Sequence, residues 1–125
     1  MINKQIKTKL AKKKYHWLVT GVAGFIGSNL LEELLLNNQK VTGIDNLSNG
    51  FMHNLNDVKK NVTLKQWKNF KFIKEDICNL DSNNKYLKKI DFTLHQAARG
   101  SVLKSIKDPI KTNKSNVTGF LNILN

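Results

Sequence analysis

The sequence predicts an α/β fold built on a doubly wound parallel sheet, and three observations support this prediction. An apolar run at 17–19 leads through three glycines into a segment with leucines at helical spacing. A second apolar run, 40–45, ends on an aspartate. Two more β-like runs follow at 70–74 and 91–95, each after a helix-like segment. Strands that alternate with helices in this way form βαβ units, whose strands are parallel.

The composition limits the class of protein. The chain has 125 residues, enough for one domain, and its one cysteine, Cys78, fits a reducing compartment such as the cytoplasm. No apolar run approaches the length of a membrane span. The formal charge of +12 comes almost wholly from lysine, and Arg99 is the only arginine. Because specific recognition of nucleic acid favours arginine, we expect a solvated lysine-rich surface, with neither nucleic acid nor membrane as partner.

Residues 1–14 are expected to form a basic appendage to the domain at 15–125. Six lysines and no acidic residue lie in this segment. Ile2, Ile6 and Leu10 recur every four residues, which predicts a short amphipathic helix packed on the domain edge. A helix lying on a membrane surface stays an open alternative.

The glycine-rich turn is the first candidate binding site. A strand over 16–20 passes through Gly21, Gly24 and Gly27 into a helix that runs to about Leu36. Such a turn aims bare backbone N–H groups and the positive end of a helix dipole at one point, which suits a pyrophosphate. The sequence therefore predicts dinucleotide binding, and the alternative is a purely structural turn.

Asp45 indicates which dinucleotide to expect. It ends the strand over 40–45, at about the 20-residue distance from the glycines where a carboxylate accepts the hydroxyls of the adenosine ribose. Its charge would repel a 2′-phosphate, and no arginine follows in the loop to offset that repulsion. The sequence predicts NAD rather than NADP, with a turn-forming aspartate as the structural alternative.

The segment after Asp45 continues the adenosine side of the expected site. The loop 46–50 is polar and able to wrap an adenosine. A helical stretch is expected from His53 towards Trp67, with an interruption near Asn61. The alternation of apolar and polar residues at 70–74 predicts the third strand.

The following segment leads to the other side of the first strand. Asp76 comes directly after the third strand, where its side chain would bind the adenine amino group. A helix is expected over about 79–89 and a fourth strand over 91–95. If that strand lies on the opposite side of the first strand from the second, the loop 96–101 and the glycine turn flank a topological switch point, where such sheets bind ligands.

Two side chains near this loop have open interpretations. His95 is interpreted as a buried strand histidine rather than a catalytic one. Arg99 either pairs with a diphosphate or lies in solvent, and the sequence does not choose between them. Further on, Asp108 and Pro109 form a helix start, and the pattern of that helix stops at Asn125 without a capping glycine. This predicts a chain truncated within a helix.

Five motifs stand out in this chain: Thr20-Gly21-Val22-Ala23-Gly24-Phe25-Ile26-Gly27, Asp45-Asn46, Asp76-Ile77, His95-Gln96-Ala97-Ala98 and Asn116-Val117-x-Gly119. Together they resemble the extended short-chain dehydrogenase/reductases, the NAD-dependent epimerase/dehydratase family. Within that family, the run from Gly100-Ser101-Val102 to Asp108-Pro109 resembles bacterial UDP-N-acetylglucosamine 4-epimerases. The resemblance implies a Rossmann-type fold of which only the N-terminal portion is present.

The resemblance implies a 4-epimerase of a UDP-hexose or UDP-N-acetylhexosamine, an isomerase of nucleotide-sugar metabolism and polysaccharide biosynthesis. NAD would take a hydride from C4 of the sugar and return it to the opposite face. The family's catalytic Tyr-x-x-x-Lys is missing, since Val19 and Ile90 stand four residues after Tyr15 and Tyr86. We therefore expect an inactive fragment of an enzyme whose full-length relatives are homodimers. The alternatives are a sugar-nucleotide dehydratase, decarboxylase or reductase, or a non-catalytic nucleotide-binding protein.

The resemblance also assigns the candidate site. No catalytic residue and no metal ligand is expected in this chain. Two residues at the pocket edge would contact the sugar nucleotide, Gly100 and Ser101. The residues expected to bind NAD are Gly21, Gly24, Phe25, Ile26, Gly27, Asp45, Asn46, Leu47, Ser48, Asn49, Gly50, Asp76, Ile77, Gln96, Ala97, Ala98 and Asn116.

Overall fold

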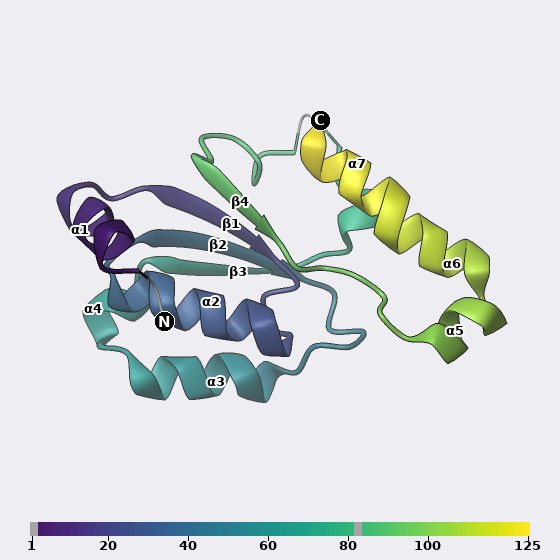
Figure 1. Ribbon diagram of the computed structural model, residues 1–125, viewed down its shortest axis with the longest axis horizontal. Coiled ribbons are helices and arrows are strands. Elements are labelled where there is room, and N and C mark those ends of the chain that lie inside the picture. The colour runs from purple at the N-terminus through teal and green to yellow at the C-terminus, as the bar shows by residue number, and fades with distance from the viewer. Residues whose placement is uncertain (1–2, 82–83) are drawn as a thin grey trace.

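The computed structural model describes residues 3–81 and 84–125 as a four-stranded parallel sheet with helices on both faces (Figure 1). The strands are β1 (His16–Thr20), β2 (Lys40–Asp45), β3 (Phe70–Lys74) and β4 (Phe92–His95), in the order β3-β2-β1-β4. The predicted strands and the doubly wound arrangement are confirmed. Because β2 and β4 lie on opposite sides of β1, a switch point lies where β1 and β4 end.

Three helices lie on the side of the sheet that faces down in Figure 1: α2 (Phe25–Leu36), α3 (Met52–Asn61) and α4 (Leu64–Trp67). The leucines at helical spacing in α2 are the reason for this packing, since Leu31 and Leu35 are fully buried against Val19 and Val41. Each such burial stabilises the fold by roughly 1.5–3 kcal/mol. The α3–α4 break confirms the interruption predicted near Asn61.

The opposite face packs on the turn η1 (Ile77–Asn79) and on the last helix, α7 (Gly119–Leu124). Leu18 and Ile44 point to this side because side chains alternate along a strand, and they form a core with Ile77 and Leu80. Ile123 of α7 packs against the same core. The two cores hold the carboxyl ends of the strands in place, which is where the candidate site lies.

The helix predicted over about 79–89 is wrong for the described residues of that segment. The chain forms the short turn η1 and then further turns, because polar side chains bond the nearby backbone instead of leaving it to a helix. Asn84 Oδ1 accepts the N–H of Tyr86, and Lys89 adopts a left-handed φ of 62°. Ser82 and Asn83, within the same prediction, lie outside the described residues.

The C-terminal part holds one helix that the sequence did not indicate. This helix is α5 (Val102–Lys107), begun by Ser101, whose Oγ accepts the N–H of Lys104 at 3.3 Å. The predicted start at Asp108 is confirmed, since its carboxylate accepts the N–H of Lys111. From there α6 (Pro109–Asn113), the π-helical turn η2 (Lys114–Thr118) and α7 run on as one rod (Figure 1).

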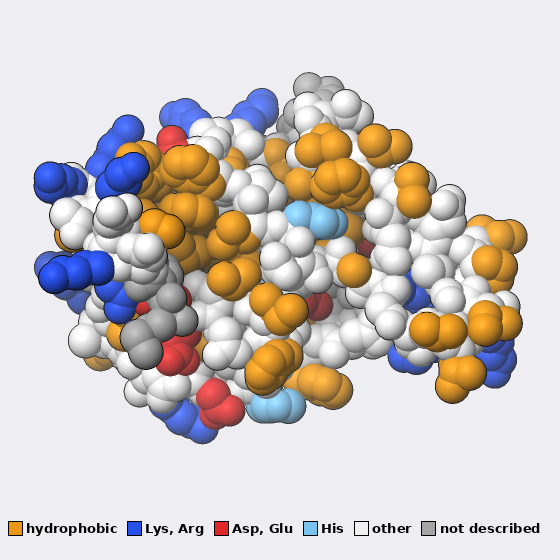
Figure 2. Space-filling view, in the orientation of Figure 1, with side chains coloured by type: hydrophobic (Ala, Val, Ile, Leu, Met, Phe, Trp, Pro, Cys, Tyr) orange, Lys and Arg blue, Asp and Glu red, His pale blue; other side chains and the backbone are white. Residues whose placement is uncertain are grey.

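The basic N-terminal segment forms a docked helix, α1 (Lys4–Lys12), and Figure 2 shows blue basic side chains gathered at this end of the molecule. Leu10 is buried, as its spacing predicts, whereas Ile6 is half exposed. Gln39, itself 1% exposed, joins this helix to the sheet. Its Nε2 donates to the carbonyls of Leu10, Lys13 and Asn37, and its Oε1 accepts the N–H of Tyr15 at 2.9 Å. None of the described helices is long and apolar enough to cross a lipid bilayer.

Replacing Gln39 with leucine is expected to release α1. The variant leaves the buried carbonyl of Leu10 without its donor, which costs about 1–3 kcal/mol for a buried unsatisfied polar group. Urea denaturation and hydrogen exchange of the α1 amides measure the loss. Gln5→Leu, on the exposed side of α1, is the matched control, and equal stability of the two variants would contradict the role of Gln39.

Candidate functional site

The glycine turn after β1 brings three segments together at the switch point. Gly21 adopts φ +66°, and its N–H donates to the carbonyl of Ile44 at 2.8 Å, so the turn sits on the end of β2. A Cβ on Gly21 would lie 2.7 Å from the backbone nitrogen of Ala97. Glycine is therefore required both for the left-handed conformation and for the close approach of the loop after β4.

The start of α2 faces this turn with its backbone donors. Gly24 is the N-cap residue and offers no side-chain hydrogen bond, so the N–H groups of the first turn have no side-chain acceptor. The side chains of Phe25 and Ile26 point away and are 83% and 57% exposed. What these residues offer a ligand is their backbone, at the positive end of the helix.

Asp45 lies at the end of β2, 8% exposed, against the glycine turn. Its Oδ2 accepts the N–H of Ala23 at 2.9 Å, and its Oδ1 accepts the N–H of Leu47 at 2.7 Å. The bond from Leu47 is the one expected if Asp45 were only a turn-forming aspartate. Asp45 makes this bond and also lines the pocket. Each carboxylate oxygen retains lone pairs for a ligand hydroxyl.

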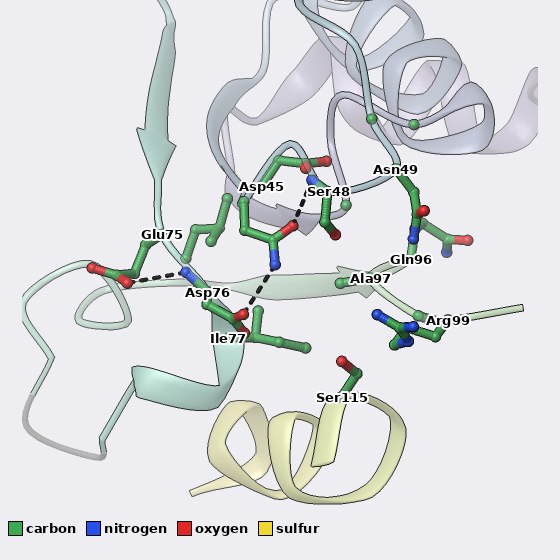
Figure 3. A pocket seen from close by; sticks show the side chains of 16 residues that line it. Asp45, Ser48, Asn49, Glu75, Asp76, Ile77, Gln96, Ala97, Arg99 and Ser115 are labelled. Carbon is green, nitrogen blue, oxygen red and sulfur yellow. Dashed lines mark hydrogen bonds between the residues drawn. The ribbon is translucent and has the colours of Figure 1, made fainter. Parts of the chain in front are cut away.

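Asp76 lies two residues beyond the end of β3, on the same side of the pocket as Asp45 (Figure 3). Its Oδ1 accepts the N–H of Cys78 at 2.9 Å, and its Oδ2 accepts the side-chain amide of Asn46 at 3.0 Å. Burial raises the pKa of this carboxyl, but the hydrogen bonds from Cys78 and Asn46, with Lys114 nearby, prevail and lower it below its ordinary value. Asp76 is therefore an ionised acceptor at neutral pH.

These segments line an open pocket whose empty space, counting the solvent at its mouth, is about 600 Å³. Figure 3 shows its wall, with the adenosine-side residues predicted from the sequence on one side and the loop after β4 on the other. The predicted NAD-binding residues that line the pocket are Gly21, Gly24, Asp45, Asn46, Ser48, Asn49, Gly50, Asp76, Ile77, Gln96, Ala97 and Ala98.

Other predicted residues lie near the pocket but outside its wall. Gly27 supports the turn, and Leu47 packs on the first core at φ 59°. Ser101 caps α5 and directly follows Gly100. Neither residue is part of the pocket wall. The side-chain amide of Asn116 bonds the backbone of Arg99, and the preceding residue, Ser115, lines the pocket.

Four residues of the wall were missing from the predicted site, namely Ile44, Glu75, Arg99 and Ser115. Ile44 and Glu75 directly precede Asp45 and Asp76 in the sequence, so these two predicted residues could have indicated them. Ser115 comes from the C-terminal helix, and only its position in space brings it to the pocket. Among residues 3–81 and 84–125, no group of three or more acidic, histidine or cysteine side chains is arranged to hold a metal ion.

A buried hydroxyl connects β1 to the loop after β4. Thr20 Oγ1 accepts the N–H groups of Gln96 at 3.1 Å and Ala97 at 3.2 Å, and lies 2.8 Å from Nδ1 of His95. With both backbone donors on Thr20, its own hydrogen is free for a neutral His95. Burial lowers the pKa of His95, which favours that neutral ring. The part-buried position agrees with the structural interpretation of this histidine.

Stability is expected to fall as the pH drops below about 6.5, the ordinary histidine value. Because burial lowers the pKa of His95 in the folded state, the unfolded chain binds a proton first as the pH falls. This proton binding favours the unfolded chain below its ordinary pKa and so reduces the free energy of unfolding. The pKa of His16 is lowered too, by burial and by Lys40. His95→Asn should therefore show a smaller fall than wild type in urea midpoints between about pH 7.5 and pH 5.5. An equal fall in both proteins would contradict the role of His95.

Known proteins share this architecture. The family model described as GDP-mannose 4,6 dehydratase matches residues 18–125. The chain is 40% identical over 119 residues to a UDP-glucuronate 4-epimerase of Thermodesulfobacterium geofontis, covering 87% of this chain and 34% of that one. The match spans the glycine turn and the strands around the pocket, so the chain belongs to the GDP-mannose 4,6 dehydratase family.

Solved structures agree with this assignment. A UDP-glucose 4-epimerase of Thermus thermophilus in complex with NAD is 32% identical with a TM-score of 0.65, covering 87% of this chain and 32% of that one. DesIV of Streptomyces venezuelae, a dTDP-glucose 4,6-dehydratase with NAD and TYD bound, is 29% identical with a TM-score of 0.74, covering 87% and 34%. The expected resemblance to epimerases and dehydratases is confirmed. The chain spans about a third of the length of these relatives.

Proposed function

We propose that this chain is the NAD-binding portion of a UDP-sugar 4-epimerase. The observation that carries the proposal is Asp45, whose carboxylate lies in the pocket wall beside the uncapped start of α2. The start of α2 offers donors for a pyrophosphate and Asp45 offers an acceptor for ribose hydroxyls, which are the two features that bind the adenosine half of NAD in such folds. The relatives with NAD bound support the choice.

The residues of the chain act on the cofactor by binding and orienting it. The backbone at Gly24 to Gly27 would hold the pyrophosphate, Asp45 the ribose hydroxyls and Asp76 the adenine amino group. The loop 96–98 would face the nicotinamide. When bound, NAD would supply the nicotinamide ring that accepts a hydride from C4 of the sugar. The loop is held in place for this by its two bonds to Thr20.

The proton transfer of an epimerase requires a base that this chain does not supply. Neither Tyr15 nor Tyr86 has a lysine four residues on, and neither lines the pocket. We propose that these residues alone turn over no UDP-hexose or UDP-N-acetylhexosamine. The homodimer and the cytoplasmic location of the whole protein stay predictions.

A sugar-nucleotide dehydratase is the second candidate. It is favoured by the match to the GDP-mannose 4,6 dehydratase model and by the likeness to DesIV. The two candidates share the same cofactor pocket. They differ in residues that meet the sugar, and the pocket wall of this chain lies mostly on the nucleotide side.

Calorimetric titration of the folded protein with NAD and NADP tests the proposal. We expect NAD to bind at least about tenfold more tightly, because a 2′-phosphate would lie against the Asp45 carboxylate. Lys104 donates to Asn49 of the adenosine-side loop at 3.3 Å, so the ratio of the two affinities measures whether the Asp45 carboxylate outweighs this nearby cation. Equal or tighter binding of NADP, or no heat from a folded sample, would contradict the proposal.

A further inference from the structure

Arg99 lines the pocket, which favours the first of the two alternatives that the sequence left open, pairing with a diphosphate. Arg99 follows β4 and lines the wall together with Gln96, Ala97 and Ser115. Figure 3 shows its side chain between the end of β4 and the C-terminal helix, next to Ser115. A surface arginine would extend into solvent, whereas this one is directed at the ligand space.

The hydrogen-bonding state of this side chain points to an absent partner. Its Nε is buried and has no hydrogen-bond partner among the described residues. A buried donor left unsatisfied costs about 1–3 kcal/mol, and more for a charged group. In a native structure such a group is explained by strain, by a bound water or ion, or by a ligand, and the place of Arg99 in the pocket wall favours a ligand.

The charges of the wall indicate what the ligand group must be. Arg99 is its only cationic residue, and the acidic ones are Asp45, Glu75 and Asp76. No ion pair joins Arg99 to any of them within the described part of the chain. Its planar guanidinium therefore remains available for an anion, and phosphate oxygens match that geometry.

The backbone of Arg99 is fixed by one side chain of the C-terminal helix. Asn116 Oδ1 accepts the N–H of Arg99 at 2.7 Å, and its Nδ2 donates to the carbonyl of Arg99 at 3.0 Å. This pair of bonds ties the loop after β4 to η2 and sets where the arginine side chain begins. Asn116 thus acts on the pocket through Arg99.

We propose that Arg99 binds a diphosphate in this pocket and that Asn116 is its positioning residue. The inference rests on the proposed function, since the pocket must accept a dinucleotide or a sugar nucleotide. A diphosphate is common to NAD and to UDP. The structure thereby adds a side-chain cation, from the loop after β4, to the backbone donors of the α2 start.

The test compares Arg99→Leu and Arg99→Lys with wild type in titrations with NAD, UDP and adenosine. Arg99→Leu should bind the diphosphate ligand about tenfold to a hundredfold more weakly and with less dependence on salt. Arg99→Lys should recover part of the loss, and adenosine should bind equally to all three. Loss with NAD identifies the cofactor diphosphate, and loss with UDP identifies that of the sugar nucleotide. Lys88→Leu, before β4 and outside the pocket wall, is the matched charge control.

The outcomes separate the two proposals. Wild type that binds neither NAD nor UDP would overturn the proposed function and this inference together. Wild type that binds NAD, with Arg99→Leu binding both diphosphates as tightly, would overturn the inference alone. An equal loss with adenosine would also overturn it, because that loss would be structural. Circular dichroism establishes that each variant is folded.

A double-mutant cycle tests Asn116. Asn116→Ala should weaken diphosphate binding severalfold in wild type and have no effect in the Arg99→Leu background. Additive losses would contradict its role as a positioning residue.

Discussion

Gly27→Ala is expected to destabilise the protein by roughly 3 kcal/mol or more and to abolish NAD binding. The added Cβ would collide with the carbonyl oxygen of Gly21 and lie 2.8 Å from Cα of Val22. Both are backbone atoms of the turn that holds the pocket, so no side chain can move aside. Because a domain has only about 5–15 kcal/mol of stability, this is a large share of the total. Urea denaturation gives the loss and calorimetry the binding.

Gly100→Ala is the matched control for this variant. A Cβ at Gly100 has no neighbour within 4 Å, so the same methyl group should leave stability unchanged. If Gly27→Ala were as stable as Gly100→Ala, the close packing of α2 on the glycine turn would be refuted.

Asp45→Asn is expected to weaken NAD binding by about a hundredfold or more. Hydrogen bonds from the ribose hydroxyls to a charged acceptor contribute roughly 1.5–3 kcal/mol each, and the amide keeps one acceptor oxygen without the charge. The bonds from Ala23 and Leu47 require two acceptors, so the amide also loosens the turn. The preference for NAD over NADP should shrink, because the repulsion of a 2′-phosphate is gone. Calorimetric titration with both dinucleotides measures this.

Asp57→Asn removes the same charge from α3, where Asp57 is exposed and pairs with Lys60. It should leave both affinities unchanged. Unaltered NAD affinity in Asp45→Asn would show that Asp45 serves only the turn, which is the structural alternative.

Much of the fold was predictable from local patterns. The strands and α2 follow from apolar periodicity and from the glycines and asparagines that bound them, and these signals act over a few neighbouring residues. The segment at 79–89 was predicted as a helix that leads into the fourth strand. Local competition decided otherwise, since Asp76 and Asn84 bond the backbone next to them.

The sequence by itself determined the adenosine side of the pocket, because Gly21, Asp45 and Asp76 stand at or just beyond the ends of predicted strands. The strand order was left as a condition by the sequence and was decided by the tertiary structure, in which β2 and β4 lie on opposite sides of β1. Only the tertiary structure decided the other wall. Asn116 was predicted to face the cofactor, and the structure shows that its amide bonds the backbone of Arg99. Arg99 itself had two open alternatives, and its place in the pocket wall beside Ser115 depends on how the C-terminal helix packs against the end of the sheet. That packing is set by contacts between residues far apart in the chain, which no local pattern records.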